Sequence, residues 1–353
     1  MAAQRDTLVG VCALGPGLRR DDGVMSGTWR LLAAIACLLS YGALLLGALP
    51  AMAQDYPTRP IRIISPSSAG GITDLVARLV GERIALALKA PVLVENKPGG
   101  TGAIALDFVA KAPPDGYTLV IGFSGANIFY PLLNDKLPFN AQRDFTPIIQ
   151  VFNGGNVLVT HPSVPVANLR EFVAYVKAQP KPPGYGSWGP GSGGHLAGEY
   201  LKILTGVDMF HVPYKSTTAL TTDVVGGHMP LAFLDSFNAI AQARNGKVKA
   251  IAQAGPKRSP MLANVPTLLE EGVPFGIGAW IGFFGPANLP APITLTLNKE
   301  IEKVLRAPDL KERWLTITGY NPDPTTPEEF ARIVANDWEV LKKVIADGKI
   351  RIE

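Results

Sequence analysis

Short apolar runs alternate with longer segments of helical periodicity along most of this 353-residue chain. In one such segment Val76, Val80 and Ile84 recur every four residues, so they share one face of a helix. The expected strands lie at 61–64, 92–95 and 117–121, and the expected helices at 73–88 and 103–111. Strands separated by helices of this length indicate parallel strands joined by crossover helices. We therefore expect an α/β fold with a mostly parallel sheet and helices on both faces.

The alternation breaks near the middle of the chain, where the apolar runs 147–152 and 156–160 follow each other without a helix between them. We place a crossing into a second domain at this break. The elements expected in that domain are a helix at 169–178 and strands near Tyr185, Met209, Leu231 and Val248. The chain should cross back at 276–282, because the apolar run 280–284 has no sequential partner.

Two crossings imply two lobes. One lobe is built from two stretches of chain, and the other is inserted between them. The sequence predicts that lobe 1 contains residues 54–160 and 277–353 and that lobe 2 contains residues 161–276. The length of 353 residues suits two domains of about 150 residues each.

Composition excludes several other classes of protein. With 47% apolar and 18% charged residues, the chain can bury a large core, which argues against disorder. The formal net charge is only +4, and no basic run of five or more residues is present, so we expect no nucleic-acid partner. The many Gly and Pro residues argue against a coiled coil or helical bundle.

The N-terminal 53 residues have the pattern of a secretory leader. An uncharged apolar stretch at 31–49 follows Arg30 and ends before Ala51-Met52-Ala53, a small-x-small cleavage pattern. We predict cleavage after Ala53 and a periplasmic protein; a membrane anchor is the alternative. Residues 1–24, before the second methionine, have the character of an over-extended start.

Both cysteines of the chain, Cys12 and Cys37, lie in this leader. The exported protein, residues 54–353, would contain no disulfide and no cysteine-ligated zinc. The four histidines also lack the spacing of a metal site, so we expect no metal and no cofactor.

A glycine-rich loop precedes a predicted helix once in each half of the chain, at 65–74 and at 189–195. Backbone N–H groups at a helix start, together with the helix dipole, form an anion site that needs no lysine. Two such helix starts facing a cleft could hold both carboxylates of a small diacid. The alternative is that Gly70-Gly71 and Gly193-Gly194 merely permit tight turns.

Two glycine-containing motifs raise enzyme alternatives. Residues 189–194 match the G-x-G-x-x-G dinucleotide pattern, although the strand before them is short and polar. Residues 122–126 nearly match G-x-S-x-G, which would make Ser124 a nucleophile, but the last glycine is missing and a poor helix should follow. A nucleotide-dependent oxidoreductase or a hydrolase is therefore the alternative to a binding protein.

The histidines have different expected roles. His161 and His211 lie beside prolines at strand ends, where a hydrogen-bonded structural role is expected. His195 lies at a helix start within the second glycine loop and could donate a hydrogen bond to a bound anion.

Several segments resemble the Bug-type solute receptors of tripartite tricarboxylate transporters. They are YPTRPI at 56–61, GGITD at 70–74, VENKPGG at 94–100, PDGYTL at 114–119, HLAGE at 195–199, HVPYK at 211–215, KRSP at 257–260 and NVPT at 264–267. The resemblance extends in order over residues 55–350.

This resemblance implies a type II periplasmic binding protein, with two α/β lobes and a ligand cleft between them. It implies no enzymatic activity, a small carboxylate ligand (a di- or aromatic carboxylate), delivery to the membrane permease subunits, and a monomer. The implied ligand-binding residues are Ser67, Ser68, Ala69, Gly70, Gly71, Thr73, Ser124, Asn127, Ser187, Trp188, Ser192, Gly193, His195 and Asp235.

The sequence departs from the family pattern at several of these positions. Ser67 stands where an aromatic residue is common, and Trp188 where a small one is usual. Leu234 follows the strand phenylalanine, and the acidic Asp235 comes one residue later. Trp188 is either a surface cap over the neighbouring helix or a wall that stacks on a planar ligand. Lys215 is either a solvated lysine or a counter-charge for the ligand.

Overall fold

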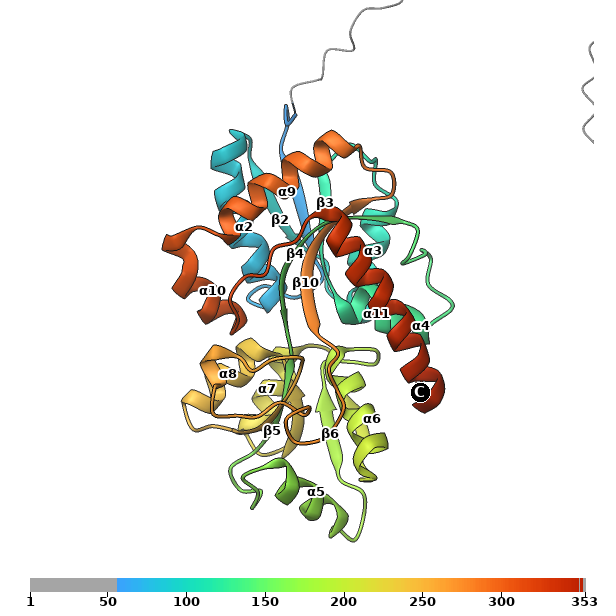
Figure 1. The fold of residues 1–353 in the computed structure, drawn as a ribbon, viewed down its shortest axis with the longest axis vertical. Helices are drawn as coiled ribbons and strands as arrows, with labels where there is room; N and C mark the ends of the chain where they lie inside the picture. The colour runs from blue at the N-terminus through green and yellow to red at the C-terminus, as the bar shows by residue number, and fades with distance from the viewer. Residues whose placement is uncertain (1–55, 349, 352–353) are drawn as a thin grey trace, which may run out of the picture. The chain divides into compact units, whose positions relative to one another are not determined.

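The computed structural model describes residues 56–348 and 350–351. The predicted leader, its cleavage site after Ala53, Cys12 and Cys37 lie outside the described residues. The described part contains two five-stranded sheets, each covered by helices on both faces (Figure 1). We call the first sheet with its helices lobe 1 and the second sheet with its helices lobe 2.

In lobe 1 the strand order is β2-β1-β3-β10-β4, and only β10 runs antiparallel to its neighbours. The strands are β1 (Ile61–Ser65), β2 (Val92–Asn96), β3 (Thr118–Phe123), β4 (Phe145–Gly154) and β10 (Ala279–Pro286). The helices are α2 (Ile72–Leu88), α3 (Ala103–Ala110), α4 (Tyr130–Leu133), α9 (Ala291–Leu305), α10 (Lys311–Thr318) and α11 (Pro327–Gly348).

In lobe 2 the strand order is β7-β6-β8-β5-β9, and only β5 runs antiparallel to its neighbours. The strands are β5 (Asn156–Thr160), β6 (Gly184–Ser187), β7 (Phe210–Pro213), β8 (Leu231–Leu234) and β9 (Lys249–Ala254). The helices are α5 (Leu169–Lys177), α6 (Gly193–Thr205), α7 (Thr217–Val225) and α8 (Ser236–Arg244). The predicted mostly parallel arrangement is therefore present in both sheets.

Each central strand buries side chains on both faces of its sheet, as parallel strands covered by helices must. In β3, Leu119 and Ile121 pack with α2 and α9, whereas Val120 faces α3 and α11. In lobe 2, Val157 and Val159 pack with α7 and α8, and the side chains of α5 and α6 cover the opposite face. Since successive side chains of a strand point to opposite faces, a register slip of one residue would exchange the two cores.

The chain passes from lobe 1 to lobe 2 at Gly155, between β4 and β5. The predicted boundary at residue 160 was therefore late by one strand: residues 156–160 form β5, which pairs with β8 and β9 of lobe 2. The two apolar runs are long enough for separate strands, and their sequence alone does not tell which sheet each strand joins. The chain returns to lobe 1 at β10, within the predicted segment 276–282.

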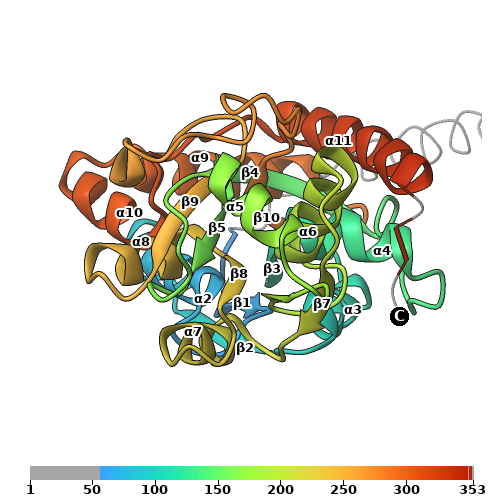
Figure 2. The ribbon, with the colours of Figure 1, turned by 90° about the horizontal axis from the view of Figure 1, so that it is seen from below.

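Helices of the two lobes also meet on either side of these crossings. Figure 2 shows α8 and α10 together at one side of the molecule and α6 and α11 at the other, and both pairs are in contact. At the first side the Ser236 hydroxyl donates to the Thr318 carbonyl over 2.6 Å, and the Ser259 hydroxyl donates to the Gly319 carbonyl. Among the described residues, no helix is both long and apolar enough to cross a membrane.

We predict that Gly155 is required at the crossing because its α-carbon faces backbone atoms. An added Cβ would lie 2.5 Å from the carbonyl oxygen of Ala254 and 2.8 Å from Cα of Gly255. Gly155→Val should lower the free energy of unfolding by about 3 kcal/mol, because backbone atoms must shift to admit the side chain. Urea denaturation followed by fluorescence measures this loss.

Gly246→Val is the matched control for this change. At Gly246 the backbone has φ +65° but no atom lies within 4 Å of an added Cβ. That variant should lose only the roughly 1–2 kcal/mol of a left-handed backbone. Equal losses at Gly155 and Gly246 would contradict the predicted clash.

Candidate functional site

A cavity of about 610 Å³ lies between the lobes and is lined by residues of both. Its walls are the loops that follow the carboxyl ends of β1, β2, β3 and β4 in lobe 1 and of β6, β7 and β8 in lobe 2. Ligands of open α/β sheets bind at this edge, because the loops and the helix N-termini gather there. The fold therefore presents helix starts from both lobes to one enclosed space.

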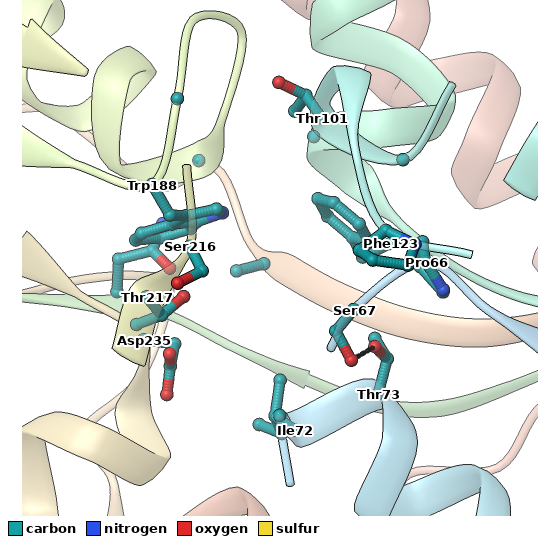
Figure 3. A pocket seen from close by; sticks show the side chains of 18 of the residues that line it. Pro66, Ser67, Ile72, Thr73, Thr101, Phe123, Trp188, Ser216, Thr217 and Asp235 are labelled. Atoms are coloured by element: carbon teal, nitrogen blue, oxygen red, sulfur yellow. Dashed lines mark hydrogen bonds between the residues drawn. The ribbon is translucent and has the colours of Figure 1, made fainter. Parts of the chain in front are cut away.

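The start of α2 forms part of the cavity wall on the lobe 1 side. Gly71 is the N-cap residue, and no side chain caps the helix, so the first N–H groups of α2 are left for a ligand. Thr73 Oγ1 donates to Ser67 Oγ over 2.7 Å, and both residues line the cavity (Figure 3). Two hydroxyls and a helix N-terminus thus converge on the same part of the wall.

Behind this wall lies the buried carboxylate of Asp74, which accepts hydrogen bonds from groups inside the protein. Asp74, in the first turn of α2, is 2% exposed and does not line the cavity. Burial alone would raise its pKa, but hydrogen bonds from Arg78, from the Gly70 N–H and from Asn96 lower it. Asp74 is therefore ionised and neutralised by Arg78, and the Gly70 N–H is used inside the protein.

Three helices of lobe 2 begin at the opposite wall, and each has a side-chain cap. Ser192 caps α6, Ser216 caps α7 and Asp235 caps α8, each by accepting a hydrogen bond from a backbone N–H three residues later. Asp235 also receives the Asn238 side-chain amide at 2.9 Å. Burial raises the pKa of Asp235, although the bonds from Asn238 and the Thr217 hydroxyl oppose the shift.

Aromatic rings from both lobes line the middle of the cavity. In Figure 3, Trp188 lies on the same side as Thr217 and Asp235, and Phe123 lies across the cavity from it. Trp188 follows β6 and is half-buried, and its Cζ3 atom would be 2.7 Å from a Cβ at Gly194. The tryptophan therefore covers the start of α6 and also forms part of the cavity wall.

One hydrogen bond links the lobes directly at the cavity. Thr101 Oγ1 of lobe 1 donates to the Pro190 carbonyl of lobe 2 over 2.6 Å. Thr101 has φ 51° and ψ 33°, a left-handed conformation that is costly for a β-branched residue. Such strain persists only where surrounding contacts hold the residue, and the bond to Pro190 is one such contact.

A buried polar network supports the Trp188 loop from behind. Ser187 Oγ lies 2.7 Å from His211 Nε2 and accepts from the Ser192 hydroxyl at 3.0 Å. The Gly191 N–H donates to His195 Nδ1 over 3.1 Å, and the rings of His195 and His211 stack with centroids 4.0 Å apart. The loop is thereby held by residues that do not touch the cavity.

Burial keeps both stacked histidines neutral. Burial, with a smaller contribution from the charge of Lys202, lowers the pKa of His195 to about 4. Burial, followed by the proximity of His195, lowers the pKa of His211 to about 3. An Nδ1 atom that accepts a hydrogen bond carries no proton, which agrees with the neutral form of His195.

Eight of the predicted site residues line the cavity and six do not. Those that line it are Ser67, Ser68, Gly71, Thr73, Ser124, Trp188, Gly193 and Asp235. Those that do not are Ala69, Gly70, Asn127, Ser187, Ser192 and His195. Ala69 and Gly70 are exposed, and the N–H of Gly70 binds Asp74.

The other four displaced residues are buried and bonded inside the protein. Asn127 accepts the Phe123 N–H with its amide oxygen, and Ser187, Ser192 and His195 belong to the network behind the Trp188 loop. The predicted bond from His195 to an anion is therefore corrected, because its ring is 4% exposed and stacked on His211. The structural role predicted for His211 agrees with its bond to Ser187.

Several lining residues were not predicted. They include Thr101, Phe123, Tyr130, Tyr214, Ser216, Thr217 and Trp280. The pattern Ser216-Thr217-Thr218 before a helix is an N-cap signal and could have indicated a third helix start. Trp280 gave no such signal, since an apolar residue in a strand normally indicates core.

The described residues contain no cluster of metal-binding side chains. No group of three or more His, Cys, Asp or Glu side chains is placed to hold a metal ion in residues 56–348. Ser124 begins a π-helix at Gly125–Phe129 that continues into α4, where a poor helix was expected. Within the same described part, Lys215 and Asp235 are the only charged residues of the cavity wall, and Lys215 is exposed.

Because both histidines are neutral in the folded protein, we predict that the protein loses stability in acid. Between pH 6.5 and 4 the unfolded chain binds protons that the folded protein excludes, so the free energy of unfolding falls as pH falls. From pH 7.5 to 5 the loss should be about 2 kcal/mol for each histidine. Urea denaturation at the two pH values measures it.

Single glutamine variants isolate the contribution of each ring. His195→Gln and His211→Gln should be less stable than the parent protein at pH 7.5, since the stack is lost. The difference between pH 7.5 and pH 5 should nevertheless shrink by about 2 kcal/mol in each variant. An undiminished pH difference in both variants would show that these histidines do not cause it.

Comparisons with known proteins agree with this geometry. The family model for the tripartite tricarboxylate transporter family receptor (TctC) matches residues 76–349. BugT of Bordetella pertussis is 31% identical over 327 residues, which cover 92% of this chain and 99% of BugT.

Two solved structures have the same architecture. The periplasmic binding protein BugD is similar with a TM-score of 0.77 and 30% identity over 84% of this chain and 100% of its own. MatC from Rhodopseudomonas palustris, with bound malate, has a TM-score of 0.75 and 32% identity over 82% of this chain and 100% of its own. The matches confirm the predicted periplasmic-binding-protein fold and indicate a solute receptor rather than a hydrolase or oxidoreductase. The chain belongs to the family of tripartite tricarboxylate transporter receptors.

Proposed function

We propose that this protein is a periplasmic receptor that binds a small carboxylate between its lobes and delivers it to the permease of a tripartite tricarboxylate transporter. The observation that carries the proposal is the uncapped N-terminus of α2, which faces an interlobe cavity beside the hydroxyls of Ser67 and Thr73. A bound carboxylate would accept the hydrogen bonds that the helix start leaves unmade. The malate bound to the similar MatC supports this ligand class.

The charge of the ligand is balanced by dipoles rather than by a buried cation. Each helix N-terminus carries roughly half a positive charge, and its effect is strong where little water is present. The one basic residue among the described lining residues, Lys215, is exposed. A site of this kind holds an anion without an ion pair, so release to a permease requires only that the lobes separate.

Replacing Gly71 tests the proposed carboxylate grip. An added Cβ at Gly71 would lie 2.8 Å from Ser67 Oγ, so a β-branched side chain must displace that hydroxyl and enter the cavity. A thermal-shift screen of mono-, di- and tricarboxylates first identifies a binding acid, because a ligand at ~100 times its Kd adds about 2.7 kcal/mol of stability. Gly71→Val should then weaken that acid at least tenfold, about 1.4 kcal/mol.

Ala69→Val is the matched control, since it adds the same side chain to an exposed position of the same loop that does not line the cavity. It should leave affinity within about twofold, which corresponds to less than ~0.5 kcal/mol. If no carboxylate raises the melting temperature, or if Gly71→Val binds as the parent does, the proposed grip is wrong.

The bond from Thr101 to Pro190 should favour ligand binding, because it joins the lobes around the cavity. Thr101→Val keeps the branched shape and removes the hydroxyl, so it should weaken binding by roughly three- to tenfold, the equivalent of one hydrogen bond. Calorimetric titration should give nearly the same loss for every acid that binds, since the bond acts on lobe closure. Thr101→Ser should retain affinity. A loss confined to one acid would indicate a direct ligand contact instead.

A further inference from the structure

The two walls of the cavity differ in charge. On the lobe 1 wall, the Ser67 hydroxyl, which accepts from Thr73, and the N–H groups at the start of α2 offer hydrogen-bond donors to an anion. On the lobe 2 wall, Asp235 is the only carboxylate and the exposed Lys215 the only cation among the described lining residues, and Asp235 lies beside Thr217 (Figure 3). A ligand that spans the cavity therefore meets donors at one end and a carboxylate at the other.

The groups that donate hydrogen bonds to Asp235 are neutral. Its oxygens accept from the Asn238 backbone N–H at 3.0 Å, from the Asn238 amide at 2.9 Å and from the Thr217 hydroxyl. These contacts hold the carboxylate in place as the cap of α8, and none of them comes from a cationic side chain. In its ionised form Asp235 would repel a second carboxylate of a ligand, whereas a ligand hydroxyl would donate a charge-assisted hydrogen bond to it.

Between the two ends, the cavity is walled by aromatic side chains. Trp188 of lobe 2 and Phe123 of lobe 1 lie on opposite sides of it, as Figure 3 shows. A planar ring fits between such walls and can stack on them. A rigid ring also loses less conformational freedom on binding than a flexible aliphatic chain of the same length.

We propose, building on the carboxylate-receptor function proposed above, that the cavity selects an aromatic monocarboxylate with a ring hydroxyl remote from the carboxylate. The carboxylate binds at the start of α2, the ring lies between Trp188 and Phe123, and the hydroxyl donates to Asp235. Trp188 and Asp235 are then the residues that determine specificity. Dicarboxylates are disfavoured because their second charge would lie against Asp235.

Three acids separate these contributions in calorimetric titrations of the exported chain. 4-Hydroxybenzoate has the ring and the hydroxyl, terephthalate replaces the hydroxyl with a second carboxylate, and adipate has two carboxylates and no ring. We expect 4-hydroxybenzoate to bind at least tenfold more tightly than either diacid. If adipate or terephthalate binds as tightly, the proposed selectivity is overturned while the carboxylate receptor stands. If none of the three acids nor any other carboxylate binds, both proposals fall.

Asp235→Asn removes the charge but keeps a good helix cap, so α8 should remain folded. The variant should bind 4-hydroxybenzoate at least fivefold more weakly and terephthalate more tightly, so that the ratio of their Kd values changes by more than tenfold.

Trp188→Ala should weaken 4-hydroxybenzoate about tenfold and adipate less than twofold, and Trp188→Phe should largely restore the affinity for the ring. Unchanged ratios in Asp235→Asn, or equal losses of both acids in Trp188→Ala, would overturn the assignment. Thermal unfolding of each variant checks that it is folded.

Discussion

The carboxyl ends of parallel strands in both sheets face a common cavity, and this constraint determines where every functional group of the protein lies. A parallel strand must be followed by a crossover helix, so each strand end brings a helix N-terminus with it. The starts of α2, α6, α7 and α8 reach the cavity for this reason. Because those of lobe 2 carry side-chain caps and α2 does not, the strongest unfilled anion site is on the lobe 1 wall.

The relation between the lobes follows from a second constraint, the close approach of backbones at the crossings. Gly155 lies against the end of β9, and a Cβ at Gly125 would lie 3.2 Å from the Gly193 nitrogen. Glycine at these positions permits contacts that a side chain would prevent. The lobes thus meet through backbone at the crossings, through α8 and α10 at one side, through α6 and α11 at the other, and through the Thr101 hydroxyl at the cavity. Of these contacts, the Thr101 bond lies where a ligand would be enclosed.

Local sequence patterns predicted most of the fold, and eight of the fourteen predicted site residues line the cavity, although most of the lining residues were not predicted. Apolar periodicity located the strands and helices, and the missing helix before β5 located the crossing. Side-chain positions that depend on distant partners were not predictable in this way. His195 stacks on His211, sixteen residues away along the chain, and does not line the cavity. Asn127 has a local partner instead, because its amide oxygen accepts the N–H of Phe123. Thr101 and Trp280 reach the cavity only because the sheet order places their segments beside it.

We propose that helix N–H groups and hydroxyls recognise the charge of a carboxylate inside the interlobe cavity. Calorimetric titration of the best-binding acid and of its primary amide tests this directly, since the two differ little in size. The acid should bind one molecule per chain and at least a hundredfold more tightly than the amide, a difference of about 2.7 kcal/mol. Equal affinities would contradict the claim, because recognition would then depend on the shape of the ligand and not on its charge.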